Sequence, residues 1–155
     1  MKTIITTILI SILFVANLSK PCLAQQATSS TATTVSNTYS LSVVIHNVNN
    51  RTGKLYVGLA NTPANFSGES LQRKVIDVPA SGEITCVFEG LAPGKYAVRL
   101  FQDLNDNKKM DFSGQMPAEP FGFSNVAMLM GPPDFDQSAF DLNENKSIRI
   151  RMLEM

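Results

Sequence analysis

Apolar residues alternate with other residues along five short segments of this chain, and this period of two is the feature that most limits its fold. Alternation of this kind places one set of side chains on a buried face of a strand and the other set toward water. Turn-forming Gly, Pro and Asn clusters separate the segments. The apolar sets are Leu41, Val43 and Ile45; Leu55, Val57 and Leu59; Ile84, Cys86 and Phe88; Tyr96, Val98 and Leu100; and Ile148, Ile150 and Met152.

Two further strands are expected at 74–78 and 138–142, and no window shows a helical repeat of useful length. About seven short strands with Gly/Pro turns predict an all-β fold, an antiparallel β-sandwich. One long loop insertion, from Asp103 to about Gln137, interrupts this pattern. Loops of such length in compact domains tend to be functional or flexible.

The N-terminus has the layout of a secretory signal peptide. A short positive region is followed by an apolar stretch from Ile4 to Val15 and by a small-residue site ending at Ala24. We therefore divide the chain into a signal peptide (1–24), a flexible Ser/Thr/Ala-rich tether (25–38) and one domain (39–155), exported to the periplasm or the extracellular space. Lipid attachment at Cys22 is disfavoured, because Lys20 and Pro21 precede it where small residues are expected.

Charge excludes some classes of partner. The chain has 13 basic and 13 acidic residues, and the segment 1–24 carries two of the lysines and no acid, so the mature net charge is −2. No basic excess is available to attract nucleic acid. After cleavage Cys86 is the only cysteine, which excludes an intramolecular disulfide. No second apolar run is long enough to span a membrane.

Side-chain oxygens recur at alternate positions at the start of the insertion. In a calcium loop, positions one, three and five give side-chain oxygens and position seven gives a backbone carbonyl. Asp103, Asn105, Asn107 and the carbonyl of Lys109 take these positions, with Asp111 at position nine. The pattern predicts a weak, structural calcium site, in the range of about 0.1–1 mM that extracellular modules show.

Two departures leave a metal-free turn open as the alternative. Lys108 stands where helix-flanked calcium loops have Gly, and Gly114 stands where they have a bidentate acid. Glu119 or Asp106 could supply that acid from elsewhere. Asn and Asp are also favoured in turns without any ion, because their side chains bond nearby backbone groups.

The second half of the insertion is rich in aromatic and methionine residues. Its candidate contact residues for a protein, glycan or ligand are Glu119, Phe121, Phe123 and Phe135. Either the segment folds back as a lid over one end of the sandwich, or it presents a contact surface. Large exposed apolar patches are rare on soluble monomers, which favours the lid.

The phrase Leu91-Ala-Pro-Gly-Lys-Tyr96 feeds a strand whose first inward residue is Tyr96. Such a tyrosine can fill a sandwich corner while its hydroxyl bonds a backbone group. The phrase resembles the entry strand of transthyretin-like and carboxypeptidase-regulatory-like domains. That resemblance implies an immunoglobulin-like (prealbumin-like) sandwich.

A second resemblance covers roughly residues 41–152. It is carried by Asp103-Leu-Asn-Asp-Asn107, Asp111, Gly114-x-x-Pro-x-Glu119, Gly122-Phe-Ser-Asn125, Gly131-Pro-Pro-x-Phe135 and Ala139-Phe140. This order resembles the exported bacterial family of the 2141 domain of unknown function. It implies a secreted or periplasmic β-domain and carries no catalytic residue, substrate or cofactor.

Residues suited to catalysis are few. His46 is the only histidine, and its parity predicts an exposed side chain. Cys86 lies between two inward-facing residues, which predicts a buried and inert thiol. Acid pairs such as Glu119 and Asp111, or Asp134 and Asp136, have no spacing that specifies a glycosidase. No catalytic site is therefore expected.

Three functions remain. The first is a non-enzymatic exported binding or accessory module whose insertion is the working surface. The second is a carbohydrate- or ligand-binding module that uses the insertion aromatics as a platform. The third, a hydrolase, would need two insertion carboxylates that converge in a cleft.

Overall fold

The computed structural model describes residues 37–126 and 128–154. The predicted signal peptide, Cys22 and nearly all of the predicted tether lie outside these residues. Within them, no helix is long and apolar enough to cross a membrane.

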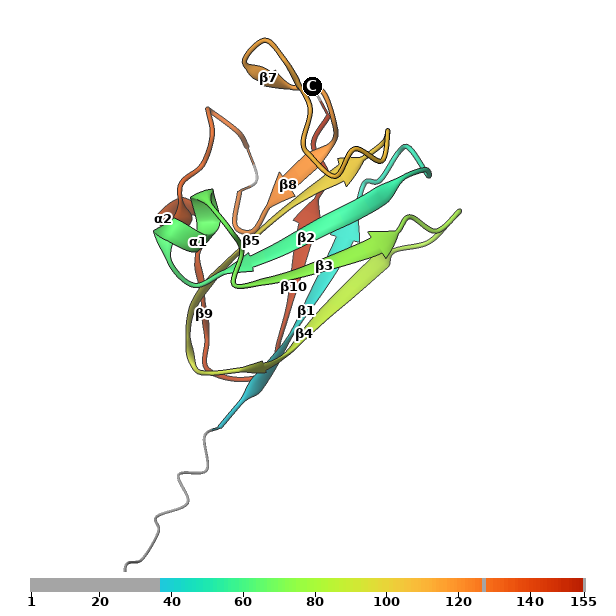
Figure 1. Ribbon diagram of the computed structural model, residues 1–155. Helices are drawn as coiled ribbons and strands as arrows, with labels where there is room; N and C mark the ends of the chain where they lie inside the picture. Colours follow the sequence, from blue (N-terminus) through green and yellow to red (C-terminus); the bar gives the residue numbers. More distant parts are fainter. Residues whose placement is uncertain (1–36, 127, 155) are drawn as a thin grey trace, which may run out of the picture. The chain divides into compact units, whose positions relative to one another are not determined.

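The described residues are mostly β, as predicted (Figure 1). The strands are Tyr39–His46 (β1), Lys54–Ala60 (β2), Gln72–Asp77 (β3), Ile84–Leu91 (β4), Gly94–Asp103 (β5), Phe112–Ser113 (β6), Met116–Pro117 (β7), Phe121–Phe123 (β8), Phe140–Leu142 (β9) and Lys146–Arg151 (β10). The helices are Pro63–Ser67 (α1) and Phe135–Ser138 (α2). Residues 104–139, between β5 and β9, are called the β5–β9 connection below.

The strands form two main sheets and a small hairpin. The first sheet has the order β10–β1–β4, and the second has the order β3–β2–β5–β8, with β9 paired to the start of β5. Strands β6 and β7 form the hairpin. All of these pairs are antiparallel except β1 with β10. The antiparallel prediction is wrong for that pair, because the whole domain separates the two strands and no tight turn dictates their direction.

One apolar core joins the two sheets. The alternating residues of β1, β2, β4 and β5 supply most of it, and Phe88, Leu41 and Leu55 are among its fully buried side chains. Tyr96 lies in the same core, and its hydroxyl donates to the carbonyl of Ala92 at 2.9 Å. The predicted tyrosine contact with a backbone group is therefore present.

Two differences from the predicted strands concern short elements. The predicted strand 138–142 begins at Phe140, because Ser138 belongs to α2. That helix starts at a capping box in which Asp134 accepts from the Gln137 N–H at 2.8 Å and Gln137 accepts from the Asp134 N–H at 3.1 Å. The other difference is the strand number, since β6, β7 and β8 are formed within the insertion.

The outer face of the second sheet is turned away from the core and is partly covered by the two helices. The helices α1 and α2 cover one end of it through Phe66 and Phe135, which pack with Ala60 and Ala97. The opposite end carries the start of the β5–β9 connection. Between the two ends runs a row that contains Gly58 and its strand neighbours.

Candidate functional site

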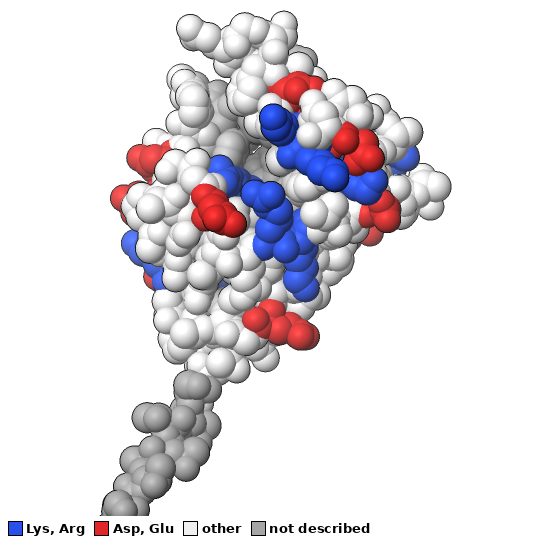
Figure 2. Space-filling model, in the orientation of Figure 1, with Lys and Arg blue, Asp and Glu red and all other residues white. Residues whose placement is uncertain are grey.

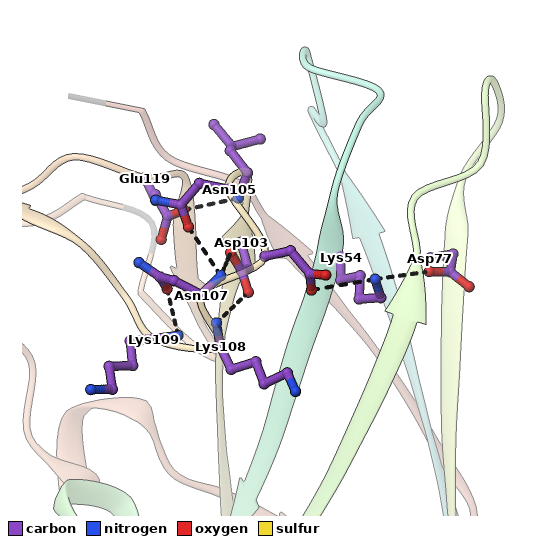
Figure 3. Close-up of polar contacts among 10 residues, drawn as sticks. Lys54, Asp77, Asp103, Asn105, Asn107, Lys108, Lys109 and Glu119 are labelled. Atoms are coloured by element: carbon purple, nitrogen blue, oxygen red, sulfur yellow. Dashed lines mark hydrogen bonds and ion pairs between the residues drawn. The ribbon is translucent and has the colours of Figure 1, made fainter.

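The polar loop 103–111 begins at the last residue of β5. The Asp103 side chain is 0% exposed, and its carboxylate accepts hydrogen bonds from the backbone N–H groups of Asn107 at 3.2 Å and Lys108 at 2.8 Å (Figure 3). These two bonds turn the chain back over the end of β5. The first residue of the predicted calcium pattern therefore organises the loop around its own carboxylate.

The other predicted ligands contact one another within the same loop. The amide of Asn105 donates to the Asp111 carboxylate at 2.6 Å, and the amide of Asn107 donates to its two oxygens at 2.9 and 3.0 Å. The Asn105 side-chain oxygen accepts from the Asn107 N–H, and that of Asn107 accepts from the Lys109 N–H. Asp103, Asn105, Asn107 and Asp111 are thus brought together, as their spacing predicted.

Lys108 adopts the backbone conformation that glycine supplies in calcium loops. Its φ angle is 66°, and that of Asp106 is 59°. Both lie in the left-handed region, which is strained for a residue with a Cβ atom. The loop therefore makes the sharp turn of the calcium pattern at the expected position, although glycine is missing there.

Glu119 closes the loop from a distant part of the chain. Its side chain is buried, and one carboxylate oxygen accepts from the Leu104 N–H at 2.8 Å while the other accepts from the Asp111 N–H at 3.1 Å. The carboxylate joins the second residue of the loop to the last one. The sequence suggested Glu119 or Asp106 as the missing acid, and the structure places Glu119 against the loop.

Asp106 instead points outward. Its carboxylate lies 3.4 Å from the Lys54 Nζ atom, and Lys54 also lies 4.0 Å from Asp77 (Figure 3). The hydrogen bond and the charge of Asp106 raise the pKa of the Lys54 ammonium. Asp106 is therefore paired with Lys54 on the surface and does not join Asp103 and Asp111.

The loop concentrates negative charge without a basic partner. In residues 37–126 and 128–154, the ion pairs involve Lys54 and Arg149, and neither Asp103, Asp111 nor Glu119 takes part. Backbone N–H groups and Asn amides are the donors to these three carboxylates. Taking a carboxylate out of water is costly unless it is paired or coordinates a metal, so these carboxylates are the residues that could hold a cation.

The donor set suits a hard cation such as calcium. It offers oxygens of Asp103, Asn105, Asn107 and Asp111, the ligand types that calcium takes in short loops. The described part of the chain contains no group of three His, Cys, Asp or Glu side chains arranged to hold a metal. A bound ion would therefore need the asparagine and backbone oxygens as well, which predicts weak binding.

The aromatic candidates lie in different environments. Phe121, in β8, is 2% exposed, and Phe135, in α2, is 6% exposed. Phe123 is half-buried and packs near Phe66 and Phe121. Phe121, Phe135 and the buried Glu119 therefore offer almost no surface to a ligand, so the predicted platform of three aromatic rings is not formed.

Other apolar residues of the connection are exposed. Phe112, Met116 and Met128 are more than half exposed, and Met130 is 93% exposed. The methionine content of the insertion signalled such a surface, whereas Phe112 was not singled out. Phe112 lies in β6, and a strand of only two residues has no alternating pattern that would predict which of its side chains is exposed.

Cys86 and Asp134, two residues considered for catalysis, have structural roles. Cys86 is buried in the core, and burial raises the pKa of its thiol, partly opposed by the Lys74 charge. A thiol of raised pKa stays protonated and unreactive near neutral pH. Asp134 caps α2 through the Gln137 N–H, so this carboxylate has a structural use.

Comparison with known proteins identifies the family. A family model described as "Uncharacterized protein conserved in bacteria (DUF2141)" matches residues 43–150. The chain belongs to this family. The matched DUF2141 region runs from β1 to β10 and includes the whole polar loop and Glu119. No curated protein and no solved structure matches the chain.

Proposed function

We propose that this DUF2141 protein is an exported, non-enzymatic binding or accessory module whose β5–β9 connection is braced by a weak calcium site. Its fold is proposed to be an immunoglobulin-like, prealbumin-like sandwich, and residues 1–24 its export signal. The ion would be structural. The working surface would be the apolar part of the connection.

One observation carries the proposal: the carboxylates of Asp103, Asp111 and Glu119 all contact the polar loop, and no basic side chain is paired to them. Asp103 is fully buried and Glu119 nearly so. Asp111 accepts from both loop asparagines. A divalent cation bound by Asp103, Asp111 and the loop asparagine oxygens would offset the repulsion between these two carboxylates. The left-handed Lys108 supports the same loop geometry.

The position of the loop favours bracing over catalysis. Glu119 accepts from backbone N–H groups at both ends of the loop, and Asp103 accepts from those of Asn107 and Lys108. An ion held by the loop carboxylates would tie the start of the connection to the segment that enters β8. Exposed Phe112, Met116 and Met130 lie in the same connection, so the ion would hold their backbone in place for binding.

The test is thermal unfolding of the protein in 5 mM calcium and in chelator. An ion at ten times its dissociation constant adds about 1.4 kcal/mol to the free energy of unfolding, so the melting temperature should rise in calcium by several degrees. Asp111→Asn should abolish most of the rise, because it removes a charged ligand and keeps a side chain of the same shape.

Asp106→Asn is the matched control. It removes the same charge from the same loop, but Asp106 points to Lys54, so the calcium-dependent rise should persist. Identical melting temperatures in calcium and chelator for the native protein would refute the calcium brace and favour the metal-free turn.

A further inference from the structure

Two arginines flank a glycine on the outer face of the second sheet. Gly58 in β2 pairs with Arg73 of β3 on one side and with Arg99 of β5 on the other. The three residues therefore form one row across the sheet, and the missing side chain leaves a notch between the guanidinium groups. Neighbouring strands lie about 4.8 Å apart, which puts the two arginine backbones roughly 10 Å from each other. Figure 2 shows Lys and Arg side chains gathered on this face.

The notch also contains a hydroxyl group. A Cβ atom at position 58 would lie 2.4 Å from the Ser70 Oγ atom, so Ser70 reaches over the backbone where only glycine leaves room. Tyr56 and Phe101, stacked at 5.0 Å between ring centroids, form the apolar wall beside it. These residues line a hollow of about 210 Å³.

Neither arginine has a carboxylate partner among the described residues. The ion pairs there involve Lys54 and Arg149, and Arg99 donates to the carbonyl of Gly68. Burial, and then repulsion from Arg73, lower the pKa of Arg99. A guanidinium has five N–H donors in a planar fork that fits a carboxylate or phosphate, so most donors of this pair are free for an anion.

A larger apolar cavity adjoins this notch. It has a volume of about 570 Å³ and is lined by residues of the β5–β9 connection, including Phe112, Met116 and Met130. Met110 and Phe123 line both hollows. No charged residue lines the larger one. Its volume falls within the range of about 300–1,000 Å³ that is usual for small-molecule sites, and methionines adapt to flexible apolar groups.

We propose that the notch and the cavity together bind one single-chain amphiphile, with its anionic head between Arg73 and Arg99 and its alkyl tail along Met110 and Phe123. A cationic end beside an uncharged, methionine-rich end is complementary to a carboxylate or phosphate that carries an alkyl chain. The inference rests on the proposed binding role, for which it names the ligand class, and does not require calcium.

The test is calorimetric titration of the protein with dodecanoate below its micelle concentration. We expect binding with a Kd below 1 mM. Arg73→Gln/Arg99→Gln should weaken it roughly tenfold or more, because charge-assisted hydrogen bonds are lost. Arg73→Gln alone should weaken dodecanoate binding several-fold. Because Arg73 is exposed, this single variant should fold normally and shows whether a loss in the double variant comes from misfolding.

Lys74→Gln/Lys95→Gln is the matched control. It removes the same charge from the same two strands, but neither lysine lines either hollow, so dodecanoate affinity should stay within twofold of native. Acetate should bind far more weakly than dodecanoate, and dodecanol should lose no affinity in the arginine variants. Dodecanoate binding that is absent, or equal in native and arginine-variant proteins, overturns the proposal.

Titrating dodecanoate in chelator, and melting the protein separately in calcium and in chelator without dodecanoate, separates this inference from the proposed function. If calcium raises the melting temperature but dodecanoate does not bind, the amphiphile site is refuted and the calcium brace stands. If dodecanoate binds through the arginines without any calcium effect, the brace is refuted and the amphiphile site stands.

Discussion

The two sheets and the β5–β9 connection are held together by different physical interactions. In the sheets, alternating side chains meet in one apolar core that includes Phe88 and Leu41. In the first part of the connection, buried carboxylates such as Asp103 and Glu119 bind backbone N–H groups. Hydrophobic burial is non-directional and proportional to area, whereas the polar loop depends on each partner being in place. The sheets should therefore be robust, and the connection sensitive to charge and ions.

The largest effect is expected in the sheet core. Phe88→Ala removes a fully buried ring and should lower the free energy of unfolding by about 3–5 kcal/mol. Met130→Ala, at a nearly fully exposed residue of the connection, should change it by less than about 0.5 kcal/mol. Guanidinium denaturation measures both. Equal losses of stability in the two variants would show that Met130 is packed as tightly as the core of the sheets.

Glu119→Gln tests the polar interactions of the connection. The substitution keeps the shape but sets an amide NH₂ against one of two backbone N–H groups. We expect a loss of about 1–3 kcal/mol, the usual effect of leaving a buried hydrogen-bonding group unsatisfied. Glu89→Gln, on an exposed position of β4, is the control and should have little effect in the same denaturation experiment.

The pH dependence of the core rests on Cys86. Burial raises the pKa of this thiol above its ordinary value of 9.0, so the unfolded chain loses the thiol proton first as pH rises. The Cys86 thiol should therefore contribute to the free energy of unfolding below pH 9, and this contribution should be lost as the pH rises above 9. Denaturation at pH 8 and pH 10 should show a decrease in stability that Cys86→Ala reduces. A decrease unchanged in Cys86→Ala would contradict a buried thiol.

The smallest effect is expected at Lys108. Its φ of 66° costs a residue with a Cβ atom roughly 1–2 kcal/mol, and glycine removes this strain. Glycine also increases the conformational entropy of the unfolded chain, which lowers the free energy of unfolding by about 0.4–1 kcal/mol. Lys108→Gly should therefore stabilise the protein by up to about 1 kcal/mol. A destabilised variant would mean that the Lys108 side chain makes a necessary contact.

The sequence predicted best where the pattern is local. Alternation gives β1, β2, β4, β5 and β10, and the spacing of Asp103, Asn105, Asn107 and Asp111 brings these residues into one loop. Pairing between β1 and β10 could not be predicted, because it joins the two ends of the domain. A lid was favoured for the second half of the insertion, but which of its side chains would be buried, such as Phe121 and Phe135, could not be predicted, since it depends on which distant segments cover the outer face of the second sheet.

The arginine notch illustrates the same limit. Arg73, Gly58 and Arg99 lie in three separate strands and have no common motif. Only the register of β3, β2 and β5 places them in one row. Register is set by the buried face of each strand together with its turns, and it becomes visible only in the assembled sheet.

Amide hydrogen exchange in calcium and in chelator is the sharpest test of whether calcium orders the polar loop. If calcium braces the connection, the N–H groups of Leu104, Lys108 and Asp111 should exchange at least several-fold more slowly in calcium, while those of β1 and β4 keep their rates. Equal exchange of the loop amides in both conditions, or slowing that is uniform over both sheets, would contradict it.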